Sequence, residues 1–252
     1  VTLTIDAAIQ GFAEKAMREC YEVNSAAAVQ ALVMDVNTGE ILAMVSKPDF
    51  DPNNPPRDDV ETLTSRMRIR SISDVYEPGS TFKILTAAAA LETGVTNPSE
   101  GFYCSGSVTV DGSKIRCWGN PHGAESMAEA IQNSCNPVFV ELGLRLGTSR
   151  LYSYLDAFGL GKKTGVDLTG ESAGILIAKN NVKTVDLARI GFGQSVAVTP
   201  LQLICAVSAV ANGGNLMRPY IVKQIADSNG EVVLSSEPEV VANPIKESTS
   251  VL

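Results

Sequence analysis

YEPGSTFK, residues 76–83, joins an irregular segment to the helix-forming run AAAALETG at residues 87–94. Its proline and glycine suit a sharp helix entry, because proline restricts the residue before it and glycine lets a ligand approach the backbone closely. A serine in the first turn of a helix meets unpaired N–H groups and the positive end of the helix dipole, which stabilise an ionised oxygen. Ser80 is therefore a candidate nucleophile.

Lys83 follows Ser80 at a spacing that places both side chains on one face of a helix. A lysine shielded from water has a lowered pKa and can accept the proton of the hydroxyl, so the two residues form a nucleophile and base without histidine. The alternative is a capping serine beside a surface lysine, and Ser-x-x-Lys arises by chance about once in a chain of this length.

NSCNP, residues 133–137, is a second candidate element. In serine acyl-transfer sites with a lysine base, a second hydroxyl relays the proton to the leaving group and an amide side chain orients the lysine. Ser134 and Asn136 have these side chains. Taken alone, they are equally well interpreted as a helix cap and a turn residue.

The composition is that of a globular domain, with 252 residues of which 44% are hydrophobic. A net charge of −8 argues against nucleic-acid binding, which needs a basic face. No apolar run reaches the roughly 18 residues of a membrane span, and the start VTLTID lacks the features of a signal peptide. We expect a soluble piece, with any anchor or export signal outside it.

Helices and hairpins alternate along the chain, which predicts an α+β domain whose sheet recruits both termini. Short turns predict three hairpins, at Asn37-Thr38-Gly39, Asp111-Gly112 and Asn229-Gly230. Caps and apolar periodicity predict a helix after Asp6 and helices near residues 126–132, 137–157 and 200–211.

The chain resembles the transpeptidase domain of class B penicillin-binding proteins nearly end to end. The segments that carry the resemblance are VTLTIDAAIQ, NTGEILAMVSKPDFDPN, YEPGSTFK, SCNPVFV, FGLGKKTGVDLTGE and GFGQSVAVTPLQL. GSVTVDGSKIRCW and HGAESMAEAIQNSCN are most similar to the Gram-positive branch that includes the stage V sporulation protein D type. The resemblance implies one transpeptidase domain over residues 1–252, with the antiparallel sheet and flanking helices shared with serine β-lactamases.

The resemblance also implies the function. Ser80 would be the acylated nucleophile, Lys83 its base, and Ser134 with Asn136 the second motif. The substrate would be the D-Ala-D-Ala end of a peptidoglycan stem peptide, with β-lactams as mimics, an amine of a neighbouring stem as acceptor and no cofactor. We expect a membrane glycosyltransferase partner and a place on the extracytoplasmic face of a bacterial membrane, anchored by an N-terminal segment absent from this chain.

The family's third motif, Lys-Thr/Ser-Gly on a strand facing the serine, has one literal match at Lys163-Thr164-Gly165. We reject this match because it lies in a glycine-rich loop without the alternation of a strand. The true motif is expected beyond Leu252, so the sheet is expected to be incomplete at the C-terminus. The missing strands are expected to leave the alanine-rich helix after Ser80 with an exposed apolar face.

Cys20 and Cys205 are expected to be inert core residues on apolar helix faces, whereas Cys104, Cys117 and Cys135 gather around the second hairpin and the Ser-x-Asn motif. The hairpin register places Cys117 opposite Gly106 and only diagonal to Cys104, a separation too long for a disulfide. We hypothesise a Cys117–Cys135 disulfide that changes access to the site. A zinc site with His122 is not expected, since no close pair such as Cys-x-x-Cys exists.

Three other functions fit parts of the pattern. A β-lactamase would need a deacylating base that the Ser-x-Asn context does not provide. A β-lactam-sensing receptor domain would not be expected to have the TIDAAIQ and FDPN segments. A non-catalytic scaffold would be expected to have lost some of the motif residues, which are all present.

Overall fold

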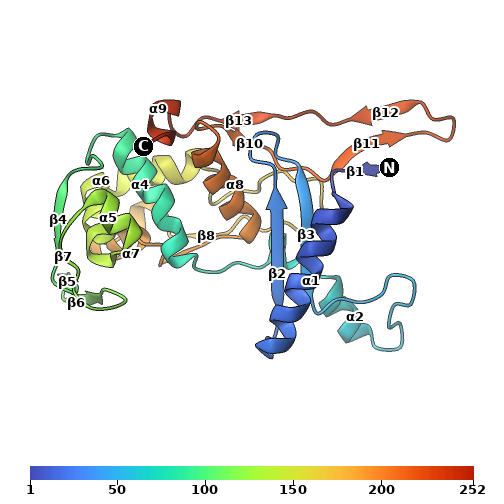
Figure 1. The fold of residues 1–252 in the computed structure, drawn as a ribbon, viewed down its shortest axis with the longest axis horizontal. Coiled ribbons are helices and arrows are strands. Elements are labelled where there is room, and N and C mark those ends of the chain that lie inside the picture. Colours follow the sequence, from blue (N-terminus) through green and yellow to red (C-terminus); the bar gives the residue numbers. More distant parts are fainter.

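A computed structural model describes all residues from Val1 to Leu252. A helical body surrounds α4 (Lys83–Glu92), and to one side α1 (Ala7–Val23) packs on the hairpin of β2 (Val29–Met34) and β3 (Ile41–Lys47) (Figure 1). The other helices are α2 (Val60–Met67), α3 (Arg70–Ser73), α5 (Met127–Gln132), α6 (Asn136–Ala157), α7 (Thr184–Ile190), α8 (Pro200–Ala211) and α9 (Glu247–Ser250), with 3₁₀ turns at Gly79–Phe82 and Lys179–Asn181.

The strands pair antiparallel in small sheets, so the α+β class is confirmed. The remaining strands are β1 (Thr2–Leu3), β4 (Gly101–Cys104), β5 (Ser107–Val110), β6 (Ser113–Arg116), β7 (Gly123–Ser126), β8 (Ile175–Leu176), β9 (Val196–Ala197), β10 (Leu216–Met217), β11 (Val222–Ala226), β12 (Val232–Ser235) and β13 (Val240–Ala242). The pairs are β2–β3, β4–β7, β5–β6, β8–β9 and β10–β13, and β1–β11–β12 forms a three-stranded sheet.

All three predicted hairpins form at their predicted turns. The sheet prediction is only partly right. The N-terminal β1 does pair with β11, but the β2–β3 hairpin forms a separate sheet and reaches the C-terminal segment through one parallel bridge, between Glu40 and Tyr220. Turn residues specify each hairpin locally, whereas the order of strands in a sheet depends on contacts between distant segments.

The alanine-rich helix α4 lies in the core, in contact with α6 and α8. Ala87 to Ala90 are at most 5% exposed, and only Ile84 on this helix remains an exposed large apolar residue, at 39%. The expected bare apolar face is therefore wrong for most of the helix. Small alanine side chains let neighbouring helices approach closely, and close packing of this kind fixes the position of the residues at the start of α4.

Helix α1 begins as predicted, because the Asp6 carboxylate accepts hydrogen bonds from the N–H groups of Ala8 and Ile9. It contains no buried residue, and Phe12 is 75% exposed. Cys20 is only partly buried, so its assignment to the core is wrong. The helix covers one side of the β2–β3 hairpin and nothing covers its outer face (Figure 1).

Helix α8 follows the sequence prediction in both position and cap. The Thr199 hydroxyl accepts from the N–H of Gln202, and Pro200 occupies the first turn. Cys205 of this helix is 3% exposed, as expected for a core residue. No helix of the chain combines the length and the apolar character that crossing a bilayer would need.

Candidate active site

Ser80 lies in the 3₁₀ turn Gly79–Phe82, which leads directly into α4. Gly79 has a positive φ of 57°, a conformation that glycine adopts without strain. The Ser80 side chain is exposed, and the Ser80 carbonyl accepts the N–H of Lys83. The hydroxyl is thus accessible from solvent at the entry of a helix.

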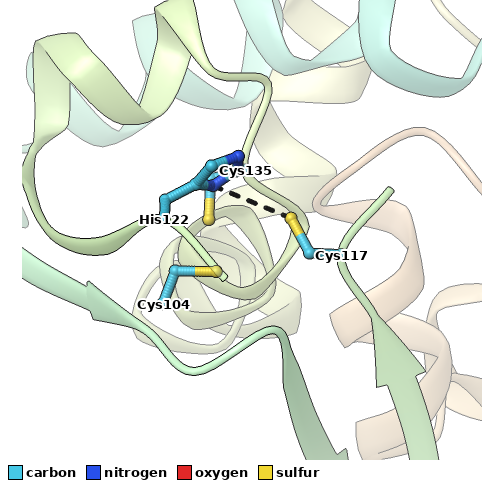
Figure 2. A group of neighbouring side chains, drawn as sticks. All are labelled: Cys104, Cys117, His122 and Cys135. Carbon is cyan, nitrogen blue, oxygen red and sulfur yellow. Dashed lines mark hydrogen bonds between the residues drawn. The ribbon is translucent and has the colours of Figure 1, made fainter. Parts of the chain in front are cut away.

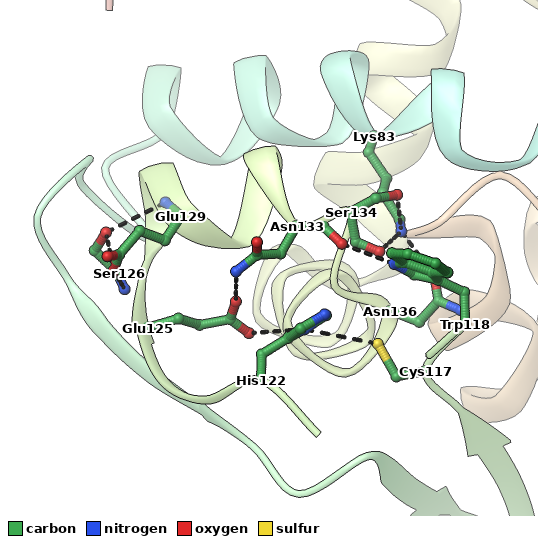
Figure 3. A network of polar contacts seen from close by, with 10 residues as sticks. All are labelled: Lys83, Cys117, Trp118, His122, Glu125, Ser126, Glu129, Asn133, Ser134 and Asn136. Atoms are coloured by element: carbon green, nitrogen blue, oxygen red, sulfur yellow. Dashed lines mark hydrogen bonds and ion pairs between the residues drawn. The ribbon is translucent and has the colours of Figure 1, made fainter. Parts of the chain in front are cut away.

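Lys83 is buried, with 4% exposure, and its ammonium is fully hydrogen-bonded. Lys83 Nζ donates to the Ser134 carbonyl at 2.6 Å, to Ser134 Oγ at 3.0 Å and to Asn136 Oδ1 at 2.7 Å (Figure 3). Three acceptors match the three protons of the ammonium. The structure therefore brings Lys83, Ser134 and Asn136 into direct contact, one helical turn from Ser80.

The environment of Lys83 favours loss of a proton near neutral pH. Burial lowers the pKa of Lys83 to about 8, while thiolate charge at Cys117 and Cys135 acts in the opposite direction. The ring of Phe139 covers the same group, with Nζ 5.4 Å from its centroid. A lysine with such a pKa supplies a neutral amine at a useful fraction without a strong base.

Ser134 connects α5 to α6 in a strained conformation, with φ at +51°. A non-glycine residue in this region costs roughly 1–3 kcal/mol and persists where the surroundings fix it. The Cys135 N–H donates to the Ala130 carbonyl, and Asn136 Nδ2 donates to the Arg116 carbonyl at 3.0 Å. These bonds fix Ser134 and Asn136 relative to the end of β6.

Two neighbours of this element were missed from sequence. The Arg116 carbonyl is the acceptor for Asn136, and Trp118 Nε1 donates to the Asn133 carbonyl at 2.8 Å while its side chain is 72% exposed. Trp118 is the sole tryptophan of the chain, and a single tryptophan beside the second hairpin could have marked it as a candidate site residue. A backbone carbonyl has no side-chain signature, so the role of Arg116 could not be found from sequence.

Gly193, also missed, supports the Ser80 turn from the other side. The Gly79 N–H donates to the Gly193 carbonyl at 2.9 Å, and a Cβ at Gly193 would lie 2.1 Å from the Gly79 carbonyl oxygen. Next to it, the Glu77 carboxylate accepts the N–H of Ser195 at 2.8 Å. The glycine pair in GFGQS was the available signal for such a close backbone approach.

Lys163-Thr164-Gly165 forms no strand, in agreement with the sequence analysis. The N–H and hydroxyl of Thr164 both donate to Glu171 Oε1, at 2.7 and 2.5 Å. Lys163 lines a cavity of about 250 Å³ together with Phe158 and Cys205. The literal motif is part of a folded loop between α6 and β8.

The cysteines around the second motif converge with His122 (Figure 2). The ligand atoms of Cys104, Cys117, His122 and Cys135 all lie within 4.8 Å of one another, and Cys117 Sγ is 3.9 Å from His122 Nδ1. Backbone pairing of Cys117 with Gly106 is as predicted, at 2.9 Å. These four ligand atoms come from separate segments, so a search for close pairs such as Cys-x-x-Cys does not detect the cluster.

The cysteine side chains are all free thiols. Burial raises the pKa of Cys104, but hydrogen bonds from the N–H groups of His122 and Gly106 outweigh it, so that this pKa is lowered overall. Burial, with the neighbouring Glu125, raises the pKa of Cys135. The Cys117–Cys135 disulfide remains a prediction.

An exposed serine before a helix, with a buried lysine bonded to a Ser-x-Asn element, is the arrangement of serine acyl transferases. Comparison with known proteins agrees: residues 29–251 match the family described as the penicillin binding protein transpeptidase domain. The chain belongs to this family.

Individual relatives include the stage V sporulation protein D of Bacillus subtilis, 43% identical over 251 residues, which cover 98% of this chain and 38% of that protein. The peptidoglycan D,D-transpeptidase FtsI of Escherichia coli is 31% identical over 225 residues, 89% of this chain and 37% of that one. This chain thus spans little more than a third of the length of these relatives.

Among solved structures, penicillin binding protein 3 from Mycobacterium tuberculosis, complexed with aztreonam, superposes with a TM-score of 0.89 at 30% identity. The superposition covers 99% of this chain and 55% of that one. A peptidoglycan synthetase from Bifidobacterium adolescentis has the same TM-score at 29% identity, over 99% of this chain and 45% of the other. The transpeptidase-like fold is thereby confirmed.

Proposed function

We propose that this chain is the catalytic domain of a peptidoglycan D,D-transpeptidase that acts through an acyl-enzyme at Ser80. The observation that carries the proposal is the contact of Lys83 Nζ with both Ser134 and Asn136, at 2.6 to 3.0 Å, one turn after an exposed serine. This contact joins two short motifs, each weak alone, into one site.

Acylation begins with neutral Lys83. The amine takes the Ser80 proton as the hydroxyl oxygen attacks the carbonyl carbon of the penultimate D-Ala, and N–H groups at the entry of α4 stabilise the negative charge on the carbonyl oxygen. The Lys83 proton passes through the Ser134 hydroxyl to the departing amine as the peptide bond breaks. Terminal D-Ala leaves, and the remaining peptide is an ester of Ser80.

Transfer reverses these roles. An amine of a neighbouring stem peptide attacks the ester, the new amide bond forms, and the proton lost by the amine returns to Ser80 through the same hydroxyl and lysine. Asn136 holds the lysine through Oδ1 and the end of β6 through Nδ2. A β-lactam follows only the first half, because its leaving group stays attached and blocks the acceptor.

The substrate class suggests where the protein works. Peptidoglycan stems are cross-linked on the extracytoplasmic face of the bacterial membrane, and we place this domain there, tethered by an N-terminal anchor and working beside a membrane glycosyltransferase. The relatives named for sporulation and for peptidoglycan transpeptidation support a role in cell-wall synthesis, with spore formation as one setting.

Intact-mass spectrometry tests the proposal. The full-length gene product is incubated with benzylpenicillin, alongside Ser80→Ala and a matched control, Ser153→Ala, whose hydroxyl bonds only the Ser149 carbonyl on the exposed side of α6. We expect one stable adduct in the parent and in Ser153→Ala and none in Ser80→Ala. An adduct that survives Ser80→Ala, or rapid turnover of nitrocefin, would contradict the transpeptidase assignment.

A further inference from the structure

The cluster of Cys104, Cys117, His122 and Cys135 has no part in the acyl-transfer mechanism, yet it is the densest group of metal-ligating side chains in the protein. Its members come from the end of β4, the residue after β6, the residue before β7, and the N-cap of α6. We propose that these four side chains bind a zinc ion, as a Cys₃His site directly behind the second motif.

The geometry is close to that of a tetrahedral site. Zinc–sulfur bonds of about 2.3 Å place sulfurs on a tetrahedron about 3.8 Å apart. The ligand atoms here lie within 4.8 Å of one another, and the Cys117 sulfur is 3.9 Å from a His122 ring nitrogen. Each ligand atom therefore needs to move by about 1 Å or less to complete the site.

The four side chains are largely shielded from water, as the ligands of structural zinc sites are. Cys104 and Cys135 are fully buried, Cys117 is 8% exposed and the His122 side chain 16%. Thiolates and a neutral imidazole are the ligands of structural zinc sites, and three thiolates with one imidazole select zinc over magnesium or calcium, which prefer oxygen. On binding, the three thiols release their protons to solvent and the complex keeps one negative charge.

Glu125 is a buried carboxylate beside the His122 ring. Its side chain is 2% exposed, Oε2 accepts from Asn133 Nδ2 at 3.0 Å, and Oε1 makes only a longer ion-pair contact with His122 (Figure 3). Oε1 is directed at the cluster, 3.7 Å from His122 Nδ1. Carboxylates next to metal-bound histidines accept from the ring N–H that does not bind the metal, so Glu125 would fix the orientation of the His122 ring.

The site would hold the second motif in place. Cys135 lies between Ser134 and Asn136, and Cys117 follows Arg116, whose carbonyl accepts from Asn136. One ion bound to both cysteines therefore fixes both ends of the hydrogen bond that orients Asn136. The four ligands are positioning residues for acylation, an effect that rests on the proposed function, whereas metal binding itself does not.

Metal analysis provides the first test. The full-length gene product is purified under reducing conditions with zinc sulfate, desalted, and measured for zinc by inductively coupled plasma mass spectrometry. We expect about one zinc per chain, also in Cys20→Ser, and near none in Cys104→Ser or His122→Ala. Less than a tenth of an equivalent in the parent would overturn the proposal, as would full zinc in Cys104→Ser.

Cobalt substitution avoids reliance on variants that fail to fold. Parent protein stripped with a chelator and loaded with cobalt chloride should show the intense visible bands of tetrahedral cobalt and sulfur-to-cobalt charge transfer, removed by added zinc. Glu125→Gln should bind zinc about 10–100-fold more weakly, and Glu129→Gln, which changes only the cap of α5, should not. Octahedral cobalt spectra, or equal affinities in the two variants, would contradict the site.

The hypothesised Cys117–Cys135 disulfide needs only two of these ligands, so Cys104 and His122 separate the two ideas. If thiol alkylation finds that bond in protein purified with zinc and reductant, the zinc proposal is overturned. Zinc removal should also slow benzylpenicillin acylation about tenfold, with restoration on adding zinc. Zinc binding without any acylation would reject the proposed function alone. An acylation rate that is the same with and without zinc would reject the positioning role.

Discussion

Lys83 lies between two regions that are held together in different ways. On the Ser80 side, α4 is fixed by buried alanines and by the backbone contact of Gly79 with Gly193. On the other side, Ser134 and Asn136 lie in a strained connection fixed by backbone hydrogen bonds and backed by the cysteine cluster. Packing fixes the position of the proposed nucleophile Ser80, whereas polar contacts fix the positions of Ser134 and Asn136, so the two regions should respond differently to substitution.

The largest effect is expected at the residue that both regions share. Lys83→Met keeps the length of the side chain but removes the base, so we expect benzylpenicillin acylation to slow by about 10²–10⁴-fold. Lys163→Met is the matched control, because Lys163 belongs to the Lys-Thr-Gly sequence that lies in a loop. This variant should be acylated at the parental rate. Stopped-flow acylation rates of both variants decide this, and a strong defect in Lys163→Met would overturn our rejection of that motif.

The second largest loss of acylation rate is expected from substitutions in the Ser134–Asn136 element. Asn136→Ala removes an acceptor for the Lys83 ammonium and the donor to the Arg116 carbonyl. Hydrogen bonds to charged groups contribute about 1.5–3 kcal/mol, so acylation should slow by roughly 10–100-fold. Asn181→Ala, in an exposed turn, is the control. Parental rates in Asn136→Ala would show that Lys83 does not need this contact.

The pH dependence should report the buried lysine. Burial lowers the pKa of Lys83 to about 8, so below that pH the ammonium predominates and the neutral base decreases about tenfold per pH unit. Acylation should rise with pH and level off above about 8. Rate constants measured from pH 6 to 9.5 test this, and a flat profile would exclude neutral Lys83 as the base.

Substitutions near the Gly79–Gly193 contact should lower the free energy of unfolding more than they lower the acylation rate. In Gly193→Ala the new Cβ meets the Gly79 carbonyl oxygen at 2.1 Å, so we expect a loss of about 3 kcal/mol and a Tm lower by about 6–12 °C. Gly170→Ala has a similar positive φ but open space around it, so it should lose only about 1 kcal/mol. Equal Tm values for both variants, measured by calorimetry, would argue against the close contact.

Sequence predicted what short-range interactions specify. The Ser80–Lys83 spacing, the hairpin register opposite Cys117 and the cap of α8 at Thr199 each depend on residues within about one or two turns. All of these are present in the structure.

The predictions that failed depend on contacts between residues far apart in the sequence. Three features depend on which distant segments pack together. They are the separate β2–β3 sheet, the exposed face of α1 with Cys20, and the burial of α4. The cysteine cluster is the clearest case, because four separate segments contribute one ligand each and no spacing between them indicates a site. The contact of Gly193 with Gly79 likewise joins residues far apart in sequence.

The central claim is that the two regions act as one acyl-transfer site through Lys83. A double-mutant cycle measures this most directly, with benzylpenicillin acylation rates of the parent, Lys83→Met, Ser134→Ala and the double variant. Residues that act as a unit are strongly non-additive, so the double variant should be about as slow as Lys83→Met alone. If the double variant is slowed by the product of the two single-variant factors, Ser134 and Lys83 act independently, which would contradict the account.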